Sequence, residues 1–195
     1  VTIGSSGVGK STFLNSLFQS TLSEKEIPES TKSIREYRYG VSEASICVNE
    51  YITRIFKNSE KLEGLQIIDA QGVEQMGQDG EQECIKDYLY KSSVVFVLFD
   101  VRSVNDYAVW DLLENVETRK VVFALTKCDL EEPDTLERQE SKLRQYMEEA
   151  GFHAPVFRLS TQWEDSFKTG REYASGEIIG SSPVLTRQQE NLNEL

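Results

Sequence analysis

The sequence predicts an α/β fold with three layers, in which a mostly parallel sheet with one antiparallel edge strand is covered by helices on both faces. Strand-like and helix-like stretches alternate along the chain, which is the pattern of parallel α/β sheets. Two strand-like stretches, SVVFVLFD at 93–100 and KVVFALT at 120–126, are continuous apolar runs, typical of strands buried on both faces. Polar motifs follow the ends of several strands, where ligands bind in such sheets.

The first half of the chain predicts a strand, a helix and an edge pair. Residues 1–3 are the stump of a strand, and a helix is expected from Lys10 to about Leu22, where apolar residues recur at helical spacing. A polar loop follows at 23–34. Two strand-like stretches between residues 35 and 56, REYRYGV and ASICVNEYITRIF, are predicted to pair as an antiparallel edge hairpin.

The second half alternates more regularly. GLQIID predicts a short strand that ends at Asp69, and a Gly-rich loop at 70–80 follows it. Helices are expected near 81–91, 105–115 and 134–150, with strands at 93–100 and 120–126 between them and PVFRLS at 155–160 as the last strand.

Residues 1–161 are expected to form one domain. A chain of 195 residues with 38% hydrophobic and 28% charged residues fits a globular domain with a proper core. Because the chain begins inside its first strand, we expect an excised domain that lacks the start of that strand. Residues 162–195 lose the alternation, and we expect an irregular surface segment and a C-terminal helix there that could belong to another domain.

Charge and composition limit the kinds of partner that the chain is expected to bind. The net charge of −12 argues against a large nucleic-acid interface, which needs Lys and Arg to displace counterions. No apolar run approaches the ~20 residues of a membrane span, although regions outside this sequence could touch a membrane surface. Cys47, Cys84 and Cys128 show no metal-ligand spacing, which favours reduced thiols in a cytoplasmic protein.

A small-residue loop between the first strand and the first helix predicts a phosphate site. GSSGVGKS at 4–11 matches the G-x-x-x-x-G-K-[ST] pattern, in which glycines let backbone N–H groups converge on one anion. Lys10 would reach the terminal phosphates, and the Ser11 hydroxyl would bind Mg²⁺. The residues expected to hold the phosphates are Gly4, Ser5, Ser6, Gly7, Val8, Gly9, Lys10, Ser11 and Thr12.

A second motif, IIDAQG at 67–72, supports the phosphate site. Asp69 stands at a strand end, where an aspartate can hold Mg²⁺ through water. The Gly72 N–H can approach a terminal phosphate because glycine has no side chain in the way.

Two further motifs indicate which nucleotide base the site would bind. In TKCD at 126–129, Asp129 can accept hydrogen bonds from N1–H and the exocyclic amine of guanine, whereas adenine would leave buried polar groups unpaired. The Lys127 stem can lie along the base, and Thr126 is expected to tie this loop to the phosphate loop. LST at 159–161 would offer backbone N–H groups of Ser160 and Thr161 to the guanine carbonyl.

These four motifs, in this order, resemble those of a P-loop GTPase G domain of the translation-factor-related class, Era-like or dynamin-like. The resemblance implies a Ras-like fold, binding of GTP and GDP, Mg²⁺, and switch loops near 23–34 and 70–80. The family carries a switch threonine whose hydroxyl joins Mg²⁺. Thr31 is the preferred candidate, with Ser30 and Ser33 as alternatives. The implied metal ligands are Ser11, Thr31 and Asp69, and the implied catalytic residues are Lys10, Thr31 and Gly72.

The chain also departs from the family pattern. Ras-like members place a water-orienting glutamine after the glycine of the second motif, and this chain has Val73 there. Gln71, Glu74 and Gln75 are the polar neighbours. Ser6 and Gly7 stand where dynamin-like members carry catalytic residues, and Gly7 replaces the asparagine of potassium-activated relatives. Thr126 stands where an asparagine is commoner.

Two functions fit this pattern. The first is a GTPase with slow intrinsic turnover whose switch loops couple the nucleotide state to a protein partner or to self-association. The alternative is a GTP- or GDP-binding interaction module with little or no hydrolysis, because a partner would have to supply the group that Val73 lacks. An ATP-dependent enzyme is disfavoured by TKCD.

Overall fold

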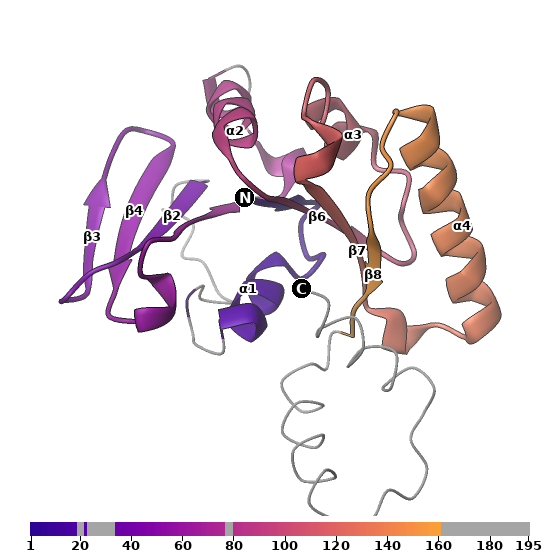
Figure 1. Ribbon diagram of the computed structural model, residues 1–195, viewed down its shortest axis with the longest axis horizontal. Helices are drawn as coiled ribbons and strands as arrows, with labels where there is room; N and C mark the ends of the chain where they lie inside the picture. The colour runs from indigo at the N-terminus through magenta and orange to yellow at the C-terminus, as the bar shows by residue number, and fades with distance from the viewer. Residues whose placement is uncertain (19–21, 23–33, 77–79, 161–195) are drawn as a thin grey trace, which may run out of the picture.

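The computed structural model describes residues 1–18, 22, 34–76 and 80–160, and the end of the predicted first helix, the loop before residue 34 and the segment from 161 on lie outside them. The described part contains one eight-stranded sheet with helices on both sides (Figure 1). The strands are β1 (Thr2–Gly4), β2 (Ile34–Tyr39), β3 (Ala44–Cys47), β4 (Ile52–Lys57), β5 (Gln66–Ala70), β6 (Val95–Asp100), β7 (Val121–Thr126) and β8 (Val156–Arg158). The α-helices are α1 (Lys10–Phe18), α2 (Gly80–Lys91), α3 (Tyr107–Leu112) and α4 (Pro133–Glu149), and the short 3₁₀ turns are η1 (Glu60–Leu62), η2 (Val73–Gln75), η3 (Thr118–Lys120) and η4 (Cys128–Leu130).

The predicted fold class is confirmed. The sheet order is β3-β4-β2-β5-β1-β6-β7-β8, and the five strands from β5 to β8 in this order all run parallel. Only β2 and β4 run against them, since β2 is antiparallel to β5 and parallel to β4. Because the carboxyl ends of the parallel strands meet at one edge, the loops after β1, β5, β7 and β8 lie along that edge.

Helices cover the two faces unequally in the described part of the chain (Figure 1). On one face, α2, α3 and α4 pack apolar side chains such as Ile85, Val109 and Leu143 against the sheet. On the other face, α1 packs through Phe13 and Leu14. This burial explains the continuous apolar runs in β6 and β7, whose side chains point alternately into the two clusters.

The edge of the sheet differs from the expected hairpin. The two stretches between residues 35 and 56 do not form one antiparallel pair, because β2 pairs with β4 in parallel. The second stretch instead folds on itself, with β3 antiparallel to β4. The Asn49 side chain makes this turn by accepting hydrogen bonds from the backbone N–H groups of Tyr51 and Ile52, both at 2.8 Å. Asparagine favours turns through such side-chain contacts, a signal that the apolar pattern on either side concealed.

Helix α3 is shorter than the 105–115 expected from the apolar spacing. It begins after Asp106, whose side chain accepts a hydrogen bond from the Ala108 N–H. It ends at Leu112, and Asn115 then takes a left-handed conformation with φ 67°. A residue with positive φ cannot continue a right-handed helix.

A buried glutamate joins three elements on the edge side of the sheet. Glu36 on β2 has no exposed surface. Its carboxylate accepts hydrogen bonds from Arg54 Nε on β4 at 3.0 Å, from Tyr88 Oη on α2 at 3.1 Å, and from Arg38 Nε. Burial alone would raise the pKa of Glu36, but the hydrogen bonds from Arg54, Arg38 and Tyr88 hold this pKa below its usual value.

We expect Glu36→Gln to lower the free energy of unfolding at pH 7 by about 1–2 kcal/mol, because charged hydrogen bonds are lost but the arginines are partly exposed to solvent. The native pKa of Glu36 lies below 4.5, so its stabilisation is complete above that pH and is lost as the pH falls through the native pKa. The difference between wild type and variant should therefore shrink at acid pH. Urea unfolding across this pH range measures it.

The matched control is Glu43→Gln, because Glu43 is exposed and its contact to Lys57 spans 3.5 Å. This variant should unfold like the wild type. A Glu36→Gln protein as stable as the wild type at pH 7 would show that the cluster contributes no net stability.

Candidate functional site

The loop between β1 and α1 has the backbone shape of an anion site. Gly4, Gly7 and Gly9 have φ values of 151°, 67° and 101°, which L side chains adopt rarely. The loop also begins in close contact with the sheet, because a Cβ on Gly4 would lie 2.4 Å from the carbonyl oxygen of Leu98 on β6. The backbone conformation therefore favours glycine at all three positions, and at Gly4 a side chain would also clash with the sheet.

Lys10 lies at the centre of this loop. It is the first residue of α1 and only 8% exposed. Its Nζ donates hydrogen bonds to the carbonyl oxygens of Gly4 at 2.9 Å and Ser5 at 2.7 Å. Burial lowers the pKa of Lys10 to about 8, while the carboxylates of Asp69 and Glu74 act in the opposite direction. The ammonium group is thus held where an anion in the loop would meet it.

Asp69 and Ser11 lie together at the ends of β5 and the phosphate loop. The Ser11 hydroxyl donates to Asp69 Oδ2 over 3.4 Å, and Asp69 is 5% exposed. The described residues contain no cluster of three or more His, Cys, Asp or Glu side chains that could hold a metal ion. A hydroxyl and a carboxylate nevertheless suit Mg²⁺, which commonly takes few protein ligands and completes its shell with water and phosphate oxygens.

The segment after β5 packs directly onto the phosphate loop. A Cβ on Gly72 would lie 2.5 Å from the backbone nitrogen of Ser6, so only glycine permits this approach. The same Ser6 N–H donates to the Glu74 carboxylate at 2.5 Å.

The polar neighbours of Val73 take different positions. Val73 itself is 4% exposed and belongs to the core under α2 and α3. Gln71 Nε2 donates to Gln75 Oε1 at 3.0 Å, so these two amides contact each other. Of the three neighbours singled out from the sequence, Glu74 is the one that reaches the phosphate loop.

Asp106 contacts the phosphate loop, and the sequence did not predict this contact. The Ser5 hydroxyl donates to Asp106 Oδ2, and the other oxygen of Asp106 caps α3 through the Ala108 N–H. An aspartate directly before a helical stretch predicts the cap. No local pattern predicts its contact with Ser5, because that contact joins segments far apart in the sequence.

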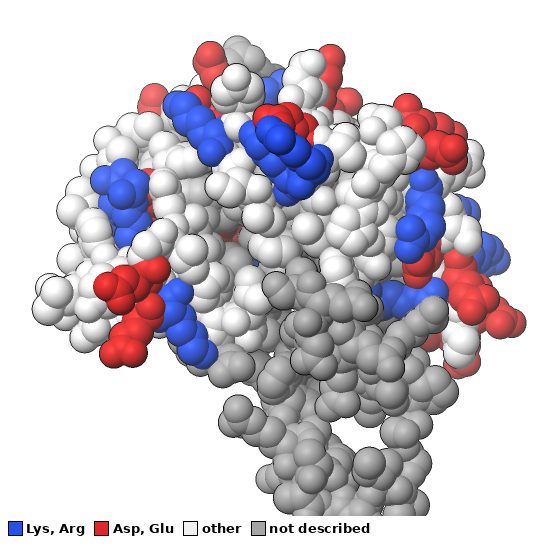
Figure 2. Space-filling model, in the orientation of Figure 1, with Lys and Arg blue, Asp and Glu red and all other residues white. Residues whose placement is uncertain are grey.

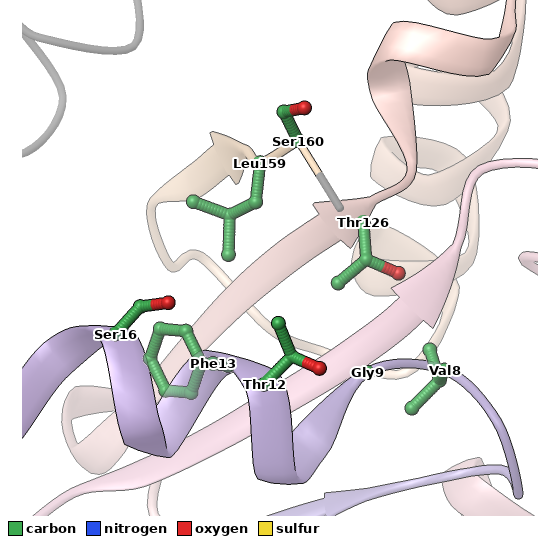
Figure 3. Close-up of a pocket in the computed structure, with 8 residues that line it drawn as sticks. All are labelled: Val8, Gly9, Thr12, Phe13, Ser16, Thr126, Leu159 and Ser160. Carbon is green, nitrogen blue, oxygen red and sulfur yellow. The ribbon is translucent and has the colours of Figure 1, made fainter. Parts of the chain in front are cut away.

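A small pocket marks the other end of the loop (Figure 3). In the figure, residues of the phosphate loop and α1 lie on one side, and the ends of β7 and β8 lie on the other. Its volume is about 20 Å³, enough for a water molecule. The lining residues are Val8, Gly9, Thr12, Phe13, Ser16, Thr126, Leu159 and Ser160.

The TKCD segment is held in place by backbone contacts. The Cys128 N–H donates to the Leu159 carbonyl at 3.0 Å, which joins the end of β7 to the end of β8. Burial raises the pKa of the Cys128 thiol to about 12. The Thr126 hydroxyl donates to the Phe99 carbonyl on β6 at 3.1 Å. This side chain thus ties the segment to the neighbouring strand, whereas a tie to the phosphate loop was expected.

Lys127 and Asp129 emerge from this anchored segment. Lys127 has a left-handed backbone with φ 59°, and its Nζ lies 2.9 Å from Asp100 Oδ2. Burial would raise the pKa of Asp100, but hydrogen bonds from Arg102 and Lys127 hold that pKa far below its usual range. Asp129 lies on η4 and is exposed. Ser160 closes the far side of the pocket, and Thr31, Thr161, Ser30 and Ser33 fall outside the described residues.

Comparison with known families decides the class of this site. The family model described as "50S ribosome-binding GTPase" matches residues 1–127, a span that includes the phosphate loop, Asp69 and Gly72. The chain belongs to this GTPase family. The match ends at residue 127, so the expected role of Asp129 in base selection rests on the sequence motif. No curated protein matches the sequence.

Solved structures show the fold of this chain. An oligomerised bacterial dynamin pair, described as a mechanism for long-range sensing and tethering of membranes, matches with a TM-score of 0.66 and 17% identity, over 99% of this chain and 37% of its own. Era in complex with MgGDPNP and a 16S ribosomal RNA fragment matches with a TM-score of 0.52 and 15% identity, over 92% of this chain and 58% of its own. Bacterial selenocysteine-specific elongation factor EF-Sec has a TM-score of 0.52 and 15% identity, over 91% of this chain and 28% of its own.

These likenesses establish the Ras-like G-domain fold. This chain spans from 28% to 58% of the length of these three structures. No helix within the described ranges has the length and apolar character needed to cross a membrane. On the face seen in Figure 2, basic and acidic side chains are interspersed and the basic ones do not gather into one patch.

The contact between Gly4 and Leu98 predicts a large cost for adding a methyl group. We expect Gly4→Ala to lower the free energy of unfolding by at least about 2 kcal/mol, because it combines backbone strain with a clash against backbone. Gly7→Ala is the matched control, since a Cβ there meets nothing within 4 Å and only the strain of about 1–2 kcal/mol remains. Urea unfolding compares them, and equal losses would show that space at Gly4 is not limiting.

Proposed function

We propose that this protein binds GTP and GDP with Mg²⁺ and hydrolyses GTP to GDP and phosphate. The observation that carries the proposal is the convergence of Lys10, Ser11, Asp69 and Gly72 at one edge of the sheet in a domain of a GTPase family. Separate segments of the chain supply a buried cation, a hydroxyl beside a carboxylate, and a glycine pressed against the loop.

Each of these residues has a role that follows from its position. The backbone N–H groups of residues 4–12 would bind phosphate oxygens, and Lys10 would turn from the Gly4 and Ser5 carbonyls to the terminal phosphates. Ser11 would ligate Mg²⁺ directly, and Asp69 would hold it through water. Thr31 is the proposed additional ligand from the switch loop near 23–34. Mg²⁺ would neutralise the charge that develops on the phosphate oxygens.

The base would be recognised at the opposite end of the loop. The pocket between α1 and the ends of β7 and β8 is the proposed entry for guanine, with Asp129 accepting from the base. Lys127 would lie along the ring, and the N–H groups of Ser160 and Thr161 would face its carbonyl. The backbone bond between Cys128 and Leu159 supports this role because it fixes TKCD beside the end of β8.

The catalytic group for water is the missing part of this site. Val73 is buried in the core and cannot orient water, and Gln71 and Gln75 bond to each other. We propose that the group comes from a surface docked over the switch loops near 23–34 and 70–80, because loop closure also excludes bulk water. The alternative is an interaction module that binds guanine nucleotide and barely hydrolyses it, which the burial of Val73 also favours.

Self-association is the docking mode that the comparisons support best. The bacterial dynamin pair is described as oligomerised and matches 99% of the chain, whereas Era is seen with ribosomal RNA. A net charge of −12 opposes binding to a phosphate backbone. We therefore propose a cytoplasmic GTPase whose partner is a protein surface, with a second copy of the chain as the first candidate.

Guanine selection is tested at Asp129. Asp129→Asn should weaken GTP binding at least about tenfold, because two hydrogen bonds to a charged acceptor are lost. The variant should bind xanthosine nucleotides better than the wild type does, since the amide can donate to the C2 oxygen of xanthine. Fluorescent-nucleotide titration measures both affinities.

The control for Asp129→Asn is Asp134→Asn, which removes an exposed carboxylate from the first turn of α4 and should leave GTP affinity unchanged. Unchanged GTP affinity in the Asp129→Asn variant would remove the basis for guanine specificity.

The burial of Val73 predicts slow turnover in the isolated protein. We expect a rate on the order of 10⁻² s⁻¹ or below at low protein concentration, in the range of unassisted G domains. The rate should rise with protein concentration if a second copy closes the site. Single-turnover hydrolysis at low and high concentration tests this, together with Gln71→Ala and Gln75→Ala.

Both alanine variants should keep the wild-type rate at low concentration, because the two amides are hydrogen-bonded to each other in the structure. Fast turnover independent of concentration, and abolished by one of these alanines, would make that glutamine catalytic and overturn the docking proposal.

A further inference from the structure

An exposed acidic side chain contacts the phosphate loop. The Glu74 carboxylate accepts a hydrogen bond from the Ser6 N–H at 2.5 Å, and its negative charge also acts on the Lys10 ammonium. A carboxylate that accepts from this loop N–H takes the place of a phosphate oxygen at that donor, and it does so near the lysine. Within the protein itself, Glu74 therefore has the chemistry of the anion that the loop is built to bind.

The position of Ser6 indicates which phosphate is replaced. The pocket at Thr126 and Ser160 marks the base end of the site. Ser6 lies at the other end, where Gly72 approaches within 2.5 Å of its backbone nitrogen. Asp69 lies on β5, three residues before Gly72. It contacts Ser11, so this side of the site is where the metal ion is proposed to bind. The third phosphate of a nucleotide extends furthest from the base, so Glu74 lies where GTP and GDP differ.

The turn that carries Glu74 is anchored in the core. Its two backbone hydrogen bonds are Gln75 N–H to Gly72 C=O at 2.8 Å and Met76 N–H to Val73 C=O at 3.2 Å. The Val73 side chain between them is buried. Glu74 cannot leave Ser6 by a large movement of this turn without exposing Val73, so its side chain is the part that is free to rotate away.

We propose that Glu74 determines the preference between the two nucleotides by occupying the site of the third phosphate, so that GTP must displace the carboxylate whereas GDP need not. This inference rests on the proposed function. It makes Glu74 a specificity-determining residue that lowers GTP affinity relative to GDP, and it makes the GTP state dependent on a conformation in which Ser6 has exchanged the carboxylate for phosphate.

The test compares binding of GDP and of β,γ-imido GTP to the full chain and to two variants. Glu74→Gln keeps the shape and removes the charge, and Glu74→Ala removes the side chain. We expect both to bind β,γ-imido GTP at least about fivefold more tightly than the wild type, consistent with loss of one charged hydrogen bond, and to bind GDP within twofold of it. Glu83→Gln, which removes an exposed charge from α2, should change neither affinity.

A second measurement does not require nucleotide. Hydrogen exchange at the Ser6 amide in the nucleotide-free protein should be faster in Glu74→Ala than in wild type, because the acceptor is gone. An unchanged ratio of the two affinities, or an equal gain for both nucleotides, would overturn the inference while leaving GDP binding, and with it the nucleotide-binding part of the proposed function, intact. A wild-type protein that binds neither nucleotide would overturn both.

Discussion

A buried ammonium group is the constraint around which this site is built. Lys10 is almost fully enclosed, and its charge is balanced by the Gly4 and Ser5 carbonyls and by nearby carboxylates. A buried cation is costly unless polar groups surround it. The tight curl of the loop brings two carbonyl groups to the amine, and the end of β5 brings the Asp69 carboxylate near it. The need to stabilise this one buried charge therefore relates the shape of the loop, the start of α1 and the edge of the sheet to one another.

The sequence predicted the parts of the site that depend on local spacing. The glycine pattern of residues 4–9 corresponds to positive φ values at three positions, and the alternation of apolar runs gave the five parallel strands. Contacts between distant segments were not predictable in this way. Asp106 reaches Ser5 across 101 positions of the chain, and the parallel pairing of β2 with β4 depends on where the hairpin docks and not on the composition of either strand.

The replacement of glutamine by Val73 has a structural explanation. A side chain at this place that is buried beneath α2 and α3 anchors the turn after Gly72, whereas a glutamine serving the phosphates would have to leave the core. Valine at this position thus stabilises the turn, but its side chain offers no polar group to a bound nucleotide. Glu74, the next residue, is then aimed at the loop by a turn whose geometry is set by packing.

The arrangement of the sheet edge also bears on how the chain folds. β4 lies between β2 and β3 in the sheet, although β3 comes before it in the chain. Closing the short turn at Asn49 costs less chain entropy than joining β2 to β4, and isolated hairpins form in about 1–10 μs. We therefore expect the β3–β4 hairpin to assemble first and to add to β2 as a unit. Addition of this outer quarter of the sheet would then be a late, separable step in folding, governed by docking of a preformed hairpin.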